Sequence, residues 1–260
     1  MRANLAGREH TVDSVDGRGV EHTCPMTQRL VFVLRRRPEL SREAFQQYWL
    51  DTHAPLVASV ADLLGITRYQ QVHTVSEDTT RAAAPFDGVA ELWFDPARST
   101  GSPDAQRDAA ALLLEDERRF IDLSSSPIWF ATEHVMADGP ADGLRSTTAV
   151  RRKAGLTREQ FRRHWAEIHG PLATSRPDVF GIVRYVQMHA PDDAATFPPA
   201  LVRGAPEPYD GLAEVYTTTV DGGAPDAAEV RAALVADTES IVDRDASPRC
   251  AGRVHVIVDR

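Results

Sequence analysis

Short apolar blocks recur along this chain, and their spacing predicts alternating strands and helices. Leu30–Leu34 is an unbroken apolar run, which is typical of a short strand. Ile66–His73 and Val89–Phe94 contain strand-forming residues without a breaker. Residues 105–122 have the pattern of an amphipathic helix, and Pro127–Met136 is predicted to be a further strand.

A helix is also predicted between the first two strands, with side chains that recur at spacings of four and three: Phe45, Trp49, His53, Leu56 and Val60. Ser41 is a suitable N-cap for this helix, and Thr157 with Gln160 fits a capping box at a second, similar helix. Pro55 lies inside the helical pattern and lacks a backbone N–H. We therefore expect the helix to kink or restart near His53–Ala54.

The same succession of blocks occurs twice. Residues 40–56 (LSREAFQQYWLDTHAPL) and 156–172 (LTREQFRRHWAEIHGPL) are identical at eight of 17 positions without a gap. Three further pairs of blocks follow in the same order: 65–73 with 181–189, 86–94 with 209–217, and 126–135 with 247–256. Each copy has the order β-α-β-β-α-β, so the chain is predicted to be a tandem pair of ferredoxin-like units.

The predicted fold class is therefore α+β, with two ferredoxin-like βαββαβ units fused into one pseudo-dimeric α/β barrel. One such unit alone would leave one face of its sheet bare, and two copies can bury these faces on each other. We expect helices on the outside and a cavity between the sheets. The expected boundaries are a flexible N-terminal extension (1–27), a first unit (28–138) and a second unit (144–260).

Composition narrows the classes of function. The 260 residues carry a net charge of −9, with a pI near 5.5, which argues against nucleic-acid binding. No apolar run approaches the ~20 residues that span a membrane, and no secretory signal is recognisable in residues 1–25. Two cysteines, Cys24 and Cys250, cannot form a disulfide framework. The expected location is the cytoplasm, as an intramolecular pseudo-dimer whose outer helices could still form a homodimer.

Together, the motif F-x-x-x-W-x-x-x-H-x-P-L, the block G-I-x-R-Y and the block F/Y-D-G-x-A-E resemble the EthD family of dimeric α/β barrels. The resemblance occurs twice and covers roughly residues 28–260. It implies a barrel with a pocket for a small molecule. Members of this family and its neighbours are linked to ether degradation beside a haem monooxygenase, to dehydration or decarboxylation of polyketides, to isomerisation and cyclisation, and to cofactor-free or haem-dependent oxygenation.

Strand alternation predicts which side chains point between the sheets. In the second copy, one set of alternating residues (Ile182, Val186, Met188) is mostly apolar, so we expect that set to lie under the helices. The opposite set is then predicted to point into the cavity: Tyr69, Gln71, His73, Tyr185, Gln187 and His189. On neighbouring strands, the cavity is expected to contain Glu91, Trp93, Glu214 and Tyr216. These residues form either an acid–base site or a polar network that only joins the sheets.

His53 and His169 are the other candidate bases, because each lies on the apolar stripe of its helix just before the proline. Alternatively, their imidazole N–H groups satisfy a carbonyl that the proline leaves free. Residues 115–117 and 237–239 are predicted to be solvated acidic helix faces. The histidines do not recur at metal-binding spacings, so no metal site is predicted.

Other conspicuous side chains have structural and functional interpretations. Arg68 and Arg184 are candidates either for structural ion pairs, with Asp87, Asp210 or the glutamates, or for binding an enolate or carboxylate. Trp49 is expected to belong to the core and is a second-choice contact for substrate. The proline-rich loop at 189–208 is predicted to be either a lid over the cavity mouth or an inert decoration.

The main functional hypothesis is a cofactor-independent lyase or isomerase for an apolar oxygenated small molecule, such as a polyketide-like or aromatic metabolite. The candidate catalytic residues are His53, Tyr69, His73, His169, Tyr185 and His189. The candidate substrate-binding residues are Trp49, Arg68, Gln71, Glu91, Trp93, Arg184, Glu214 and Tyr216. The alternatives are a cofactor-free or haem-dependent monooxygenase, and a non-catalytic binding or oxygenase-accessory protein.

Overall fold

The computed structural model describes residues 28–220 and 224–260. The predicted N-terminal extension, residues 1–27, lies outside the described residues. The first half contains four strands, three α-helices and one π-helix: β1 (Gln28–Leu34), α1 (Arg42–Tyr48), η1 (Trp49–His53), α2 (Ala54–Leu64), β2 (Ile66–Glu77), β3 (Gly88–Phe94), α3 (Pro103–Glu117) and β4 (Ile128–Asp138). Short 3₁₀ turns follow β3 and α3, at Pro96–Arg98 and Leu123–Ser125.

The second half repeats this order and adds short helices: β5 (Arg145–Val150), α4 (Arg158–His164), η4 (Trp165–His169), α5 (Gly170–Thr174), α6 (Pro177–Phe180), β6 (Ile182–His189), η5 (Ala194–Thr196), α7 (Pro198–Arg203), β7 (Gly211–Thr217), α8 (Ala227–Ile241) and β8 (Arg249–Asp259). As predicted, Ser41 caps α1, and Thr157 with Gln160 forms a capping box at α4. The expected restart of the helix is also present, because the π-helix η1 ends at His53 and α2 begins at Ala54.

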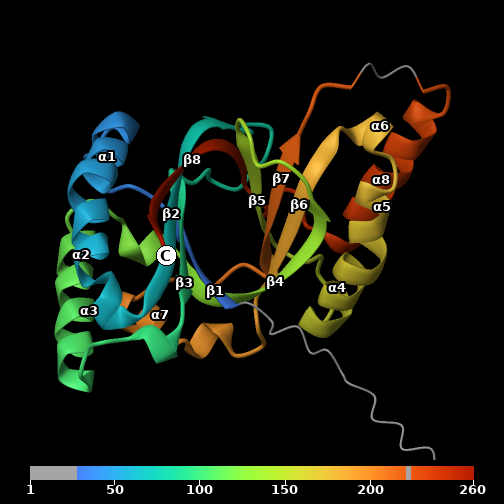
Figure 1. Cartoon of the computed structure of the whole chain (residues 1–260). Coiled ribbons are helices and arrows are strands. Elements are labelled where there is room, and N and C mark those ends of the chain that lie inside the picture. Colours follow the sequence, from blue (N-terminus) through green and yellow to red (C-terminus); the bar gives the residue numbers. More distant parts are fainter. Residues whose placement is uncertain (1–27, 221–223) are drawn as a thin grey trace, which may run out of the picture.

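The eight strands form a closed antiparallel barrel in the order β1-β3-β2-β8-β5-β7-β6-β4. Each half contributes four neighbouring strands, β4-β1-β3-β2 and β8-β5-β7-β6. The halves are joined by backbone pairing of β2 with β8 and of β4 with β6. Helices α1–α3 lie on one side of the barrel and α4, α5, α6 and α8 on the other (Figure 1). The barrel with outer helices agrees with the prediction, and the two sheets are continuous with each other through these backbone ladders.

The predicted orientation of β2 and β6 was wrong. Val72 packs inside the barrel with Val31 and Val33, whereas Tyr69 packs with the residues under the helices. The apolar set in β6, Val186 and Met188, likewise lies inside. In β6 the barrel interior holds the more apolar set, whereas in β2 it holds Val72 together with Gln70, which donates to Glu91. On the other face of β2, Tyr69 and Gln71 find their hydrogen-bond partner in Trp49. An irregularity between Ile66 and Arg68 also returns Ile66 to the helix side, against simple alternation.

Charged residues are buried inside the barrel beside this apolar cluster. Arg145 Nη1 lies 2.7 Å from Glu91 Oε2 and 2.8 Å from Glu214 Oε1. Arg29 Nη1 lies 3.2 Å from Glu91 and 3.0 Å from Glu214. The guanidinium groups of Arg29 and Arg145 hold the pKa of Glu91 well below its usual range, against the opposing effect of burial. Two guanidinium groups therefore contact two carboxyl groups that come from different halves of the chain.

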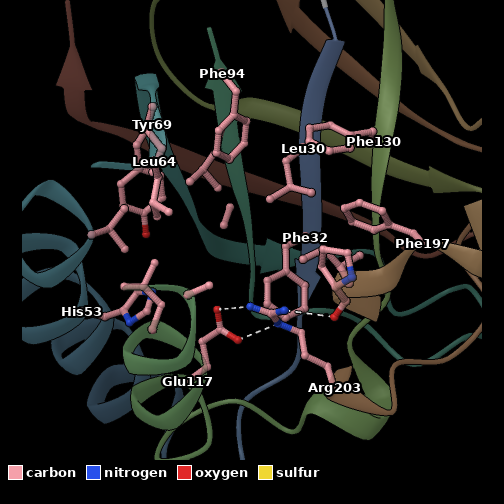
Figure 2. Close-up of a pocket in the computed structure, with 18 residues that line it drawn as sticks. Leu30, Phe32, His53, Leu64, Tyr69, Phe94, Glu117, Phe130, Phe197 and Arg203 are labelled. Atoms are coloured by element: carbon pink, nitrogen blue, oxygen red, sulfur yellow. Dashed lines mark hydrogen bonds and ion pairs between the residues drawn. The ribbon is translucent and has the colours of Figure 1, made fainter. Parts of the chain in front are cut away.

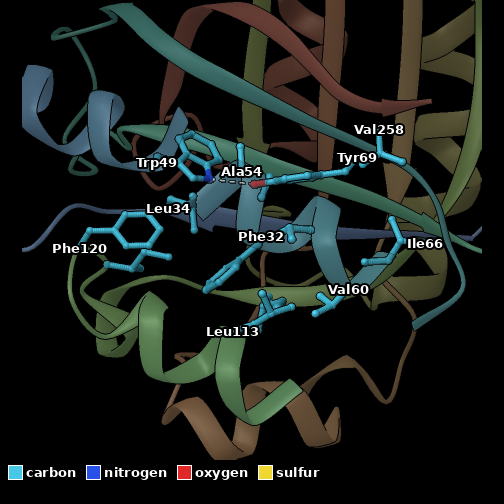
Figure 3. Close-up of a cluster of buried hydrophobic side chains, with 14 of the residues drawn as sticks. Phe32, Leu34, Trp49, Ala54, Val60, Ile66, Tyr69, Leu113, Phe120 and Val258 are labelled. Atoms are coloured by element: carbon cyan, nitrogen blue, oxygen red, sulfur yellow. Dashed lines mark hydrogen bonds between the residues drawn. The ribbon is translucent and has the colours of Figure 1, made fainter. Parts of the chain in front are cut away.

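A second core lies between the barrel and the first-half helices, where Phe32, Leu34, Trp49 and Phe120 are among the buried side chains (Figure 3). Gly88 lets Trp49 approach β3 closely, since a Cβ at this position would lie 2.5 Å from the indole ring. In the described residues, no helix combines the length and the apolar character needed to cross a membrane.

Candidate functional site

A cavity of about 280 Å³ lies on the outer face of the first-half sheet, beneath α2 and α3 (Figure 2). Most of its wall is hydrocarbon from strands and helices of the first half: Leu30, Phe32, Val57, Leu64, Ile66, Ala90, Leu92, Phe94, Ala110, Leu113, Ile128 and Phe130. The polar groups in the wall are few: His53, Tyr69, Glu117 and Arg203. A small, largely apolar molecule matches such a wall.

The π-helix η1 ends at His53 and places this side chain in the cavity wall. His53 Nδ1 lies 2.8 Å from Asp116 Oδ2 on α3, and the other oxygen of Asp116 accepts a 2.7 Å hydrogen bond from Tyr48 Oη. His53 and Asp116 are each only 6% exposed. A carboxylate accepts only, so Nδ1 carries the proton of the neutral ring, which leaves Nε2 available to the cavity as a proton acceptor.

Tyr69 supplies a hydroxyl to the same cavity. Its oxygen accepts hydrogen bonds from Trp49 Nε1 at 3.0 Å and from Gln71 Nε2 at 2.8 Å. Burial raises the pKa of Tyr69 well above its ordinary value, so the phenol stays protonated. Because its oxygen already accepts two bonds, its own O–H remains to donate to a molecule in the cavity (Figure 2).

His73 has a different position from the one predicted. Its ring stacks on Trp49 with centroids 4.7 Å apart, and its Nε2 donates to Gln71 Oε1 at 2.8 Å. Gln71 is fixed in turn by donating to the Trp49 carbonyl at 3.0 Å. His189 makes the equivalent contacts in the second half, with Gln187 and Trp165. Burial lowers the pKa of both histidines, His73 and His189, to about 3. Both rings belong to a packing network and do not line the first-half cavity.

The cavity is covered by the second half. Phe197, Pro199 and Arg203, from the proline-rich loop and α7, complete its wall. Phe197 contacts Phe130 edge-on with centroids 5.1 Å apart. Arg203 makes a bidentate ion pair with Glu117 at 2.7 and 2.8 Å (Figure 2). The predicted covering loop therefore lies over a cavity, and that cavity belongs to the opposite half of the chain.

The structure does not bring the remaining predicted residues to this cavity. Inside the barrel lie Glu91, Glu214, Tyr216, Trp93 and Arg68, the last with its guanidinium 5.0 Å from the Trp93 ring. Arg184 forms an ion pair with Asp138, at the edge where β6 meets β4. Salt bridges and apolar side chains occupy the region between the sheets where a cavity was predicted, and the first-half cavity lies outside the barrel instead.

Sequence reasoning missed Asp116 and Glu117, because it assigned the acidic stretch 115–117 to a solvated surface. Both carboxylates are buried. A signal was available, since Asp116 and Asp237 correspond at a shift of 121 residues, the same shift that relates the final strands of the two copies. Likewise, His53 does not satisfy a backbone carbonyl through Nδ1, because that nitrogen pairs with Asp116.

The second half has a corresponding cavity of about 380 Å³ beside Trp165, His169 and Tyr185. His169 Nδ1 lies 2.7 Å from Asp237 Oδ2, and His164 Nε2 lies 2.7 Å from the other oxygen of the same carboxylate. Burial lowers the pKa of His169 despite this carboxylate. The histidine–aspartate pair therefore occurs in both halves.

The two halves of the sequence match the same domain family. The EthD domain model matches residues 37–124 and again residues 153–245. The chain belongs to the EthD family. No curated protein sequence matches the chain.

This EthD protein is also similar to solved structures. A putative monooxygenase from Lactobacillus acidophilus NCFM is 11% identical, with 88% of this chain and 95% of that one covered and a TM-score of 0.45. A putative monooxygenase from Fusobacterium nucleatum subsp. nucleatum is 9% identical, with 89% of this chain and 94% of that one covered and a TM-score of 0.49. A mutant chlorite dismutase from Candidatus Nitrospira defluvii in complex with cyanide is 10% identical, with 88% of this chain and 91% of that one covered and a TM-score of 0.44. At these identities, the similarity concerns the fold.

The described residues of this EthD protein offer neither a metal site nor, in the first-half cavity, room for a haem. Among residues 28–220 and 224–260, no group of three or more His, Cys, Asp or Glu side chains could hold a metal ion. The first-half cavity of about 280 Å³ is smaller than the range of about 300–1,000 Å³ typical of pockets for drug-sized ligands. A haem is larger than most such ligands, so this cavity does not fit it.

Proposed function

We propose that the first half of this EthD protein is a proton-transfer enzyme for a small, apolar, oxygenated molecule. The observation that carries the proposal is the pairing of His53 with buried Asp116 at the wall of a nearly hydrocarbon cavity. A histidine oriented by a carboxylate is a common general base. The cofactor-independent lyase or isomerase reaction expected from the sequence fits this arrangement.

The proposed chemistry assigns one role to each polar side chain. His53 Nε2 removes a proton from a carbon next to a carbonyl, and Asp116 stabilises the imidazolium that forms. The Tyr69 hydroxyl donates a hydrogen bond to the carbonyl oxygen as it becomes an enolate. His53 then returns the proton at another carbon, which isomerises the substrate, or to a departing hydroxyl, which eliminates water.

The Glu117–Arg203 ion pair closes the cavity in this proposal. It has no net charge, and both groups are already satisfied by each other. It therefore holds α7 over the substrate without placing an unpaired charge beside the enolate. A closed apolar cavity also excludes water, which strengthens the hydrogen bond from Tyr69.

Cofactor-free oxygenation is the second candidate, and it shares the first step. The hydrocarbon wall favours it, because dioxygen is apolar and a carbanion in this cavity is shielded from protonation by water. In this case, His53 deprotonates a phenol or an activated carbon, and a carbon of the resulting anion bonds to dioxygen. The hydroperoxide formed after protonation loses its outer hydroxyl group and the remaining hydrogen of that carbon as water and leaves a carbonyl group, so the substrate supplies all the electrons.

An exchange experiment tests the shared step before the natural substrate is known. A panel of small apolar ketones and phenols is incubated with the protein in D₂O, and carbon-bound deuterium is measured by NMR while an electrode records oxygen uptake. Exchange without oxygen uptake supports the lyase or isomerase reaction, and uptake supports oxygenation. His53→Gln and Asp116→Asn should lower the rate by about 10²–10⁴-fold, the usual contribution of general-base catalysis.

His169→Gln is the matched control, because it changes the equivalent residue of the other half. It should leave the rate unchanged. Full activity in His53→Gln, in a protein that still folds, would reject proton transfer at this site. Compounds that bind without exchange or oxygen uptake would instead support a non-catalytic binding protein.

A further inference from the structure

The two cavities share their histidine–aspartate pairs but differ in the chemistry of their walls. At equivalent strand positions, Leu30 of the first half is replaced by Ser146, and Phe32 is replaced by Thr148. In the final strand of each half, Ile128 is replaced by Arg249. Hydroxyl and guanidinium groups thus stand where the first cavity has hydrocarbon.

Three arginines line the second cavity: Arg81, Arg244 and Arg249. Arg81 pairs with Asp78 at 3.0 Å, and Arg244 pairs with Glu239 at 2.9 Å. Arg249 Nε donates to Ser146 Oγ at 2.8 Å. Within the described parts of the chain, Arg249 has no carboxylate at ion-pair distance, so its charge remains available to a ligand.

The second cavity lacks the glutamate that pairs with an arginine in the wall of the first cavity. In the first cavity, Glu117 pairs with Arg203. The residue equivalent to Glu117, at the same shift as Asp116 and Asp237, is Thr238, which lines the second cavity without a charge. The wall nevertheless keeps an apolar part, which includes Phe180, Ile182 and Leu234.

We propose that the second cavity is a separate binding site for a small organic carboxylate. Its carboxylate accepts hydrogen bonds from Arg249 and from the hydroxyl groups of Ser146 and Thr148. Its hydrocarbon body packs on Phe180 and the neighbouring apolar wall. Arginine suits this role, because its planar guanidinium binds a carboxylate through two parallel hydrogen bonds. The proposal does not depend on proton transfer in the first half.

A pair of isosteric probes tests the charge requirement. Binding of 4-bromobenzoate and of neutral 4-bromobenzamide to the full chain is measured by calorimetry. The acid should bind at least about tenfold more tightly than the amide, since hydrogen bonds to charged groups are about twice as strong as neutral ones. The difference should shrink with added salt, because Arg249 is partly solvent-exposed.

Matched variants assign the difference to one cavity. Arg249→Gln should remove the preference for the acid, and its solvent-exposed position makes misfolding unexpected. Arg203→Gln, which alters the arginine of the first cavity, should keep the preference. Equal binding of acid and amide to the unaltered protein, or an unchanged preference in Arg249→Gln, would overturn the proposal.

A crystal soaked with 4-bromobenzoate locates the probe through the anomalous signal of bromine. The proposal requires a bromine peak in the cavity beside Phe180 and Trp165, with the carboxylate directed to Arg249. Bromine in the first cavity alone would overturn it. These measurements use binding only, so they can fail while the proton-transfer reaction of the first half stands, or succeed while that reaction fails.

Discussion

Acid should destabilise this EthD protein through two histidines that are buried without charge. Burial lowers the pKa of His73 and of His189 to about 3 in the folded protein, against an ordinary value of 6.5. The unfolded chain therefore binds protons at these sites below pH 6.5, while the folded protein does not. Stability from these groups is complete above about pH 7 and falls as the pH decreases from 6.5 towards 3.

The magnitude follows from proton linkage. Between pH 7 and pH 5, each histidine removes about 2 kcal/mol from the free energy of unfolding, and the pair removes about 4 kcal/mol. Glu214 acts in the opposite direction, because burial and nearby Glu91 raise its pKa, despite the two arginines, to about 8.

The assay therefore compares variants with the parent protein, so that the contribution of Glu214 cancels. Urea unfolding is measured at pH 7, 6 and 5 for the parent and for His73→Gln/His189→Gln. Glutamine keeps an N–H donor for Gln71 and Gln187 and does not titrate. The variant is expected to be less stable at pH 7, where the stacking on Trp49 and Trp165 is lost, and to lose about 4 kcal/mol less than the parent between pH 7 and pH 5.

Between pH 5 and pH 7, the histidines of the unfolded chain titrate, whereas most acidic groups titrate at lower pH. Hydrogen bonds from Thr80 and Arg81 hold the pKa of Asp78 at about 2, so Asp78 loses its stabilising charge only at lower pH. If parent and variant lost the same stability between pH 7 and pH 5, His73 and His189 would not be buried neutral residues. The stacked network that excludes His73 as a base would then be incorrect.

Two further changes probe the packing of the barrel. Arg145→Met should lower the free energy of unfolding by about 3–5 kcal/mol in a urea titration, because the buried carboxylate of Glu91 then keeps only Arg29 of its two guanidinium partners. Arg184→Met, at the more exposed pair with Asp138, should cost about 1 kcal/mol or less. Gly88→Ala should lower the melting temperature by an amount that corresponds to about 1–3 kcal/mol. The reason is that the added Cβ would lie 2.5 Å from the Trp49 ring and 2.6 Å from the Val72 carbonyl oxygen. Gly211→Ala should lower the melting temperature in the same way, because its Cβ would meet Trp165. An unaltered melting temperature in both glycine variants would show that the indole rings do not lie against the strands as described.

The sequence was sufficient for features that depend on local patterns and on the repeat. Duplicated blocks predicted the two halves and the barrel, and Pro55 predicted the restart of the helix at Ala54. His53 and Tyr69 were among the predicted site residues, and both line the first-half cavity. These features follow from residue types at fixed spacings, and such spacings can be seen without knowledge of the tertiary structure.

The location of the cavity could not be obtained in this way. Alternation separates the two faces of β2 but does not say which face is inside, and both faces of these strands are buried. Asp116, the partner of His53, comes from α3. Arg203, the partner of Glu117, comes from α7 in the other half of the chain. Contacts of this kind arise from tertiary packing, so no local pattern indicates them.

Pairing of β2 with β8 has a consequence for how this protein is made. The ladder joins Arg68 to Asp259, so the barrel cannot close before β8 is available to pair with β2. Until then, β2 and β4 are the two edge strands of the first-half sheet, and their unpaired N–H and C=O groups can pair with other chains. Folding should thus be slow, because the contacts that close the barrel join segments far apart in the chain. Chaperones that shield the edges of unpaired strands should raise the yield of correctly folded protein.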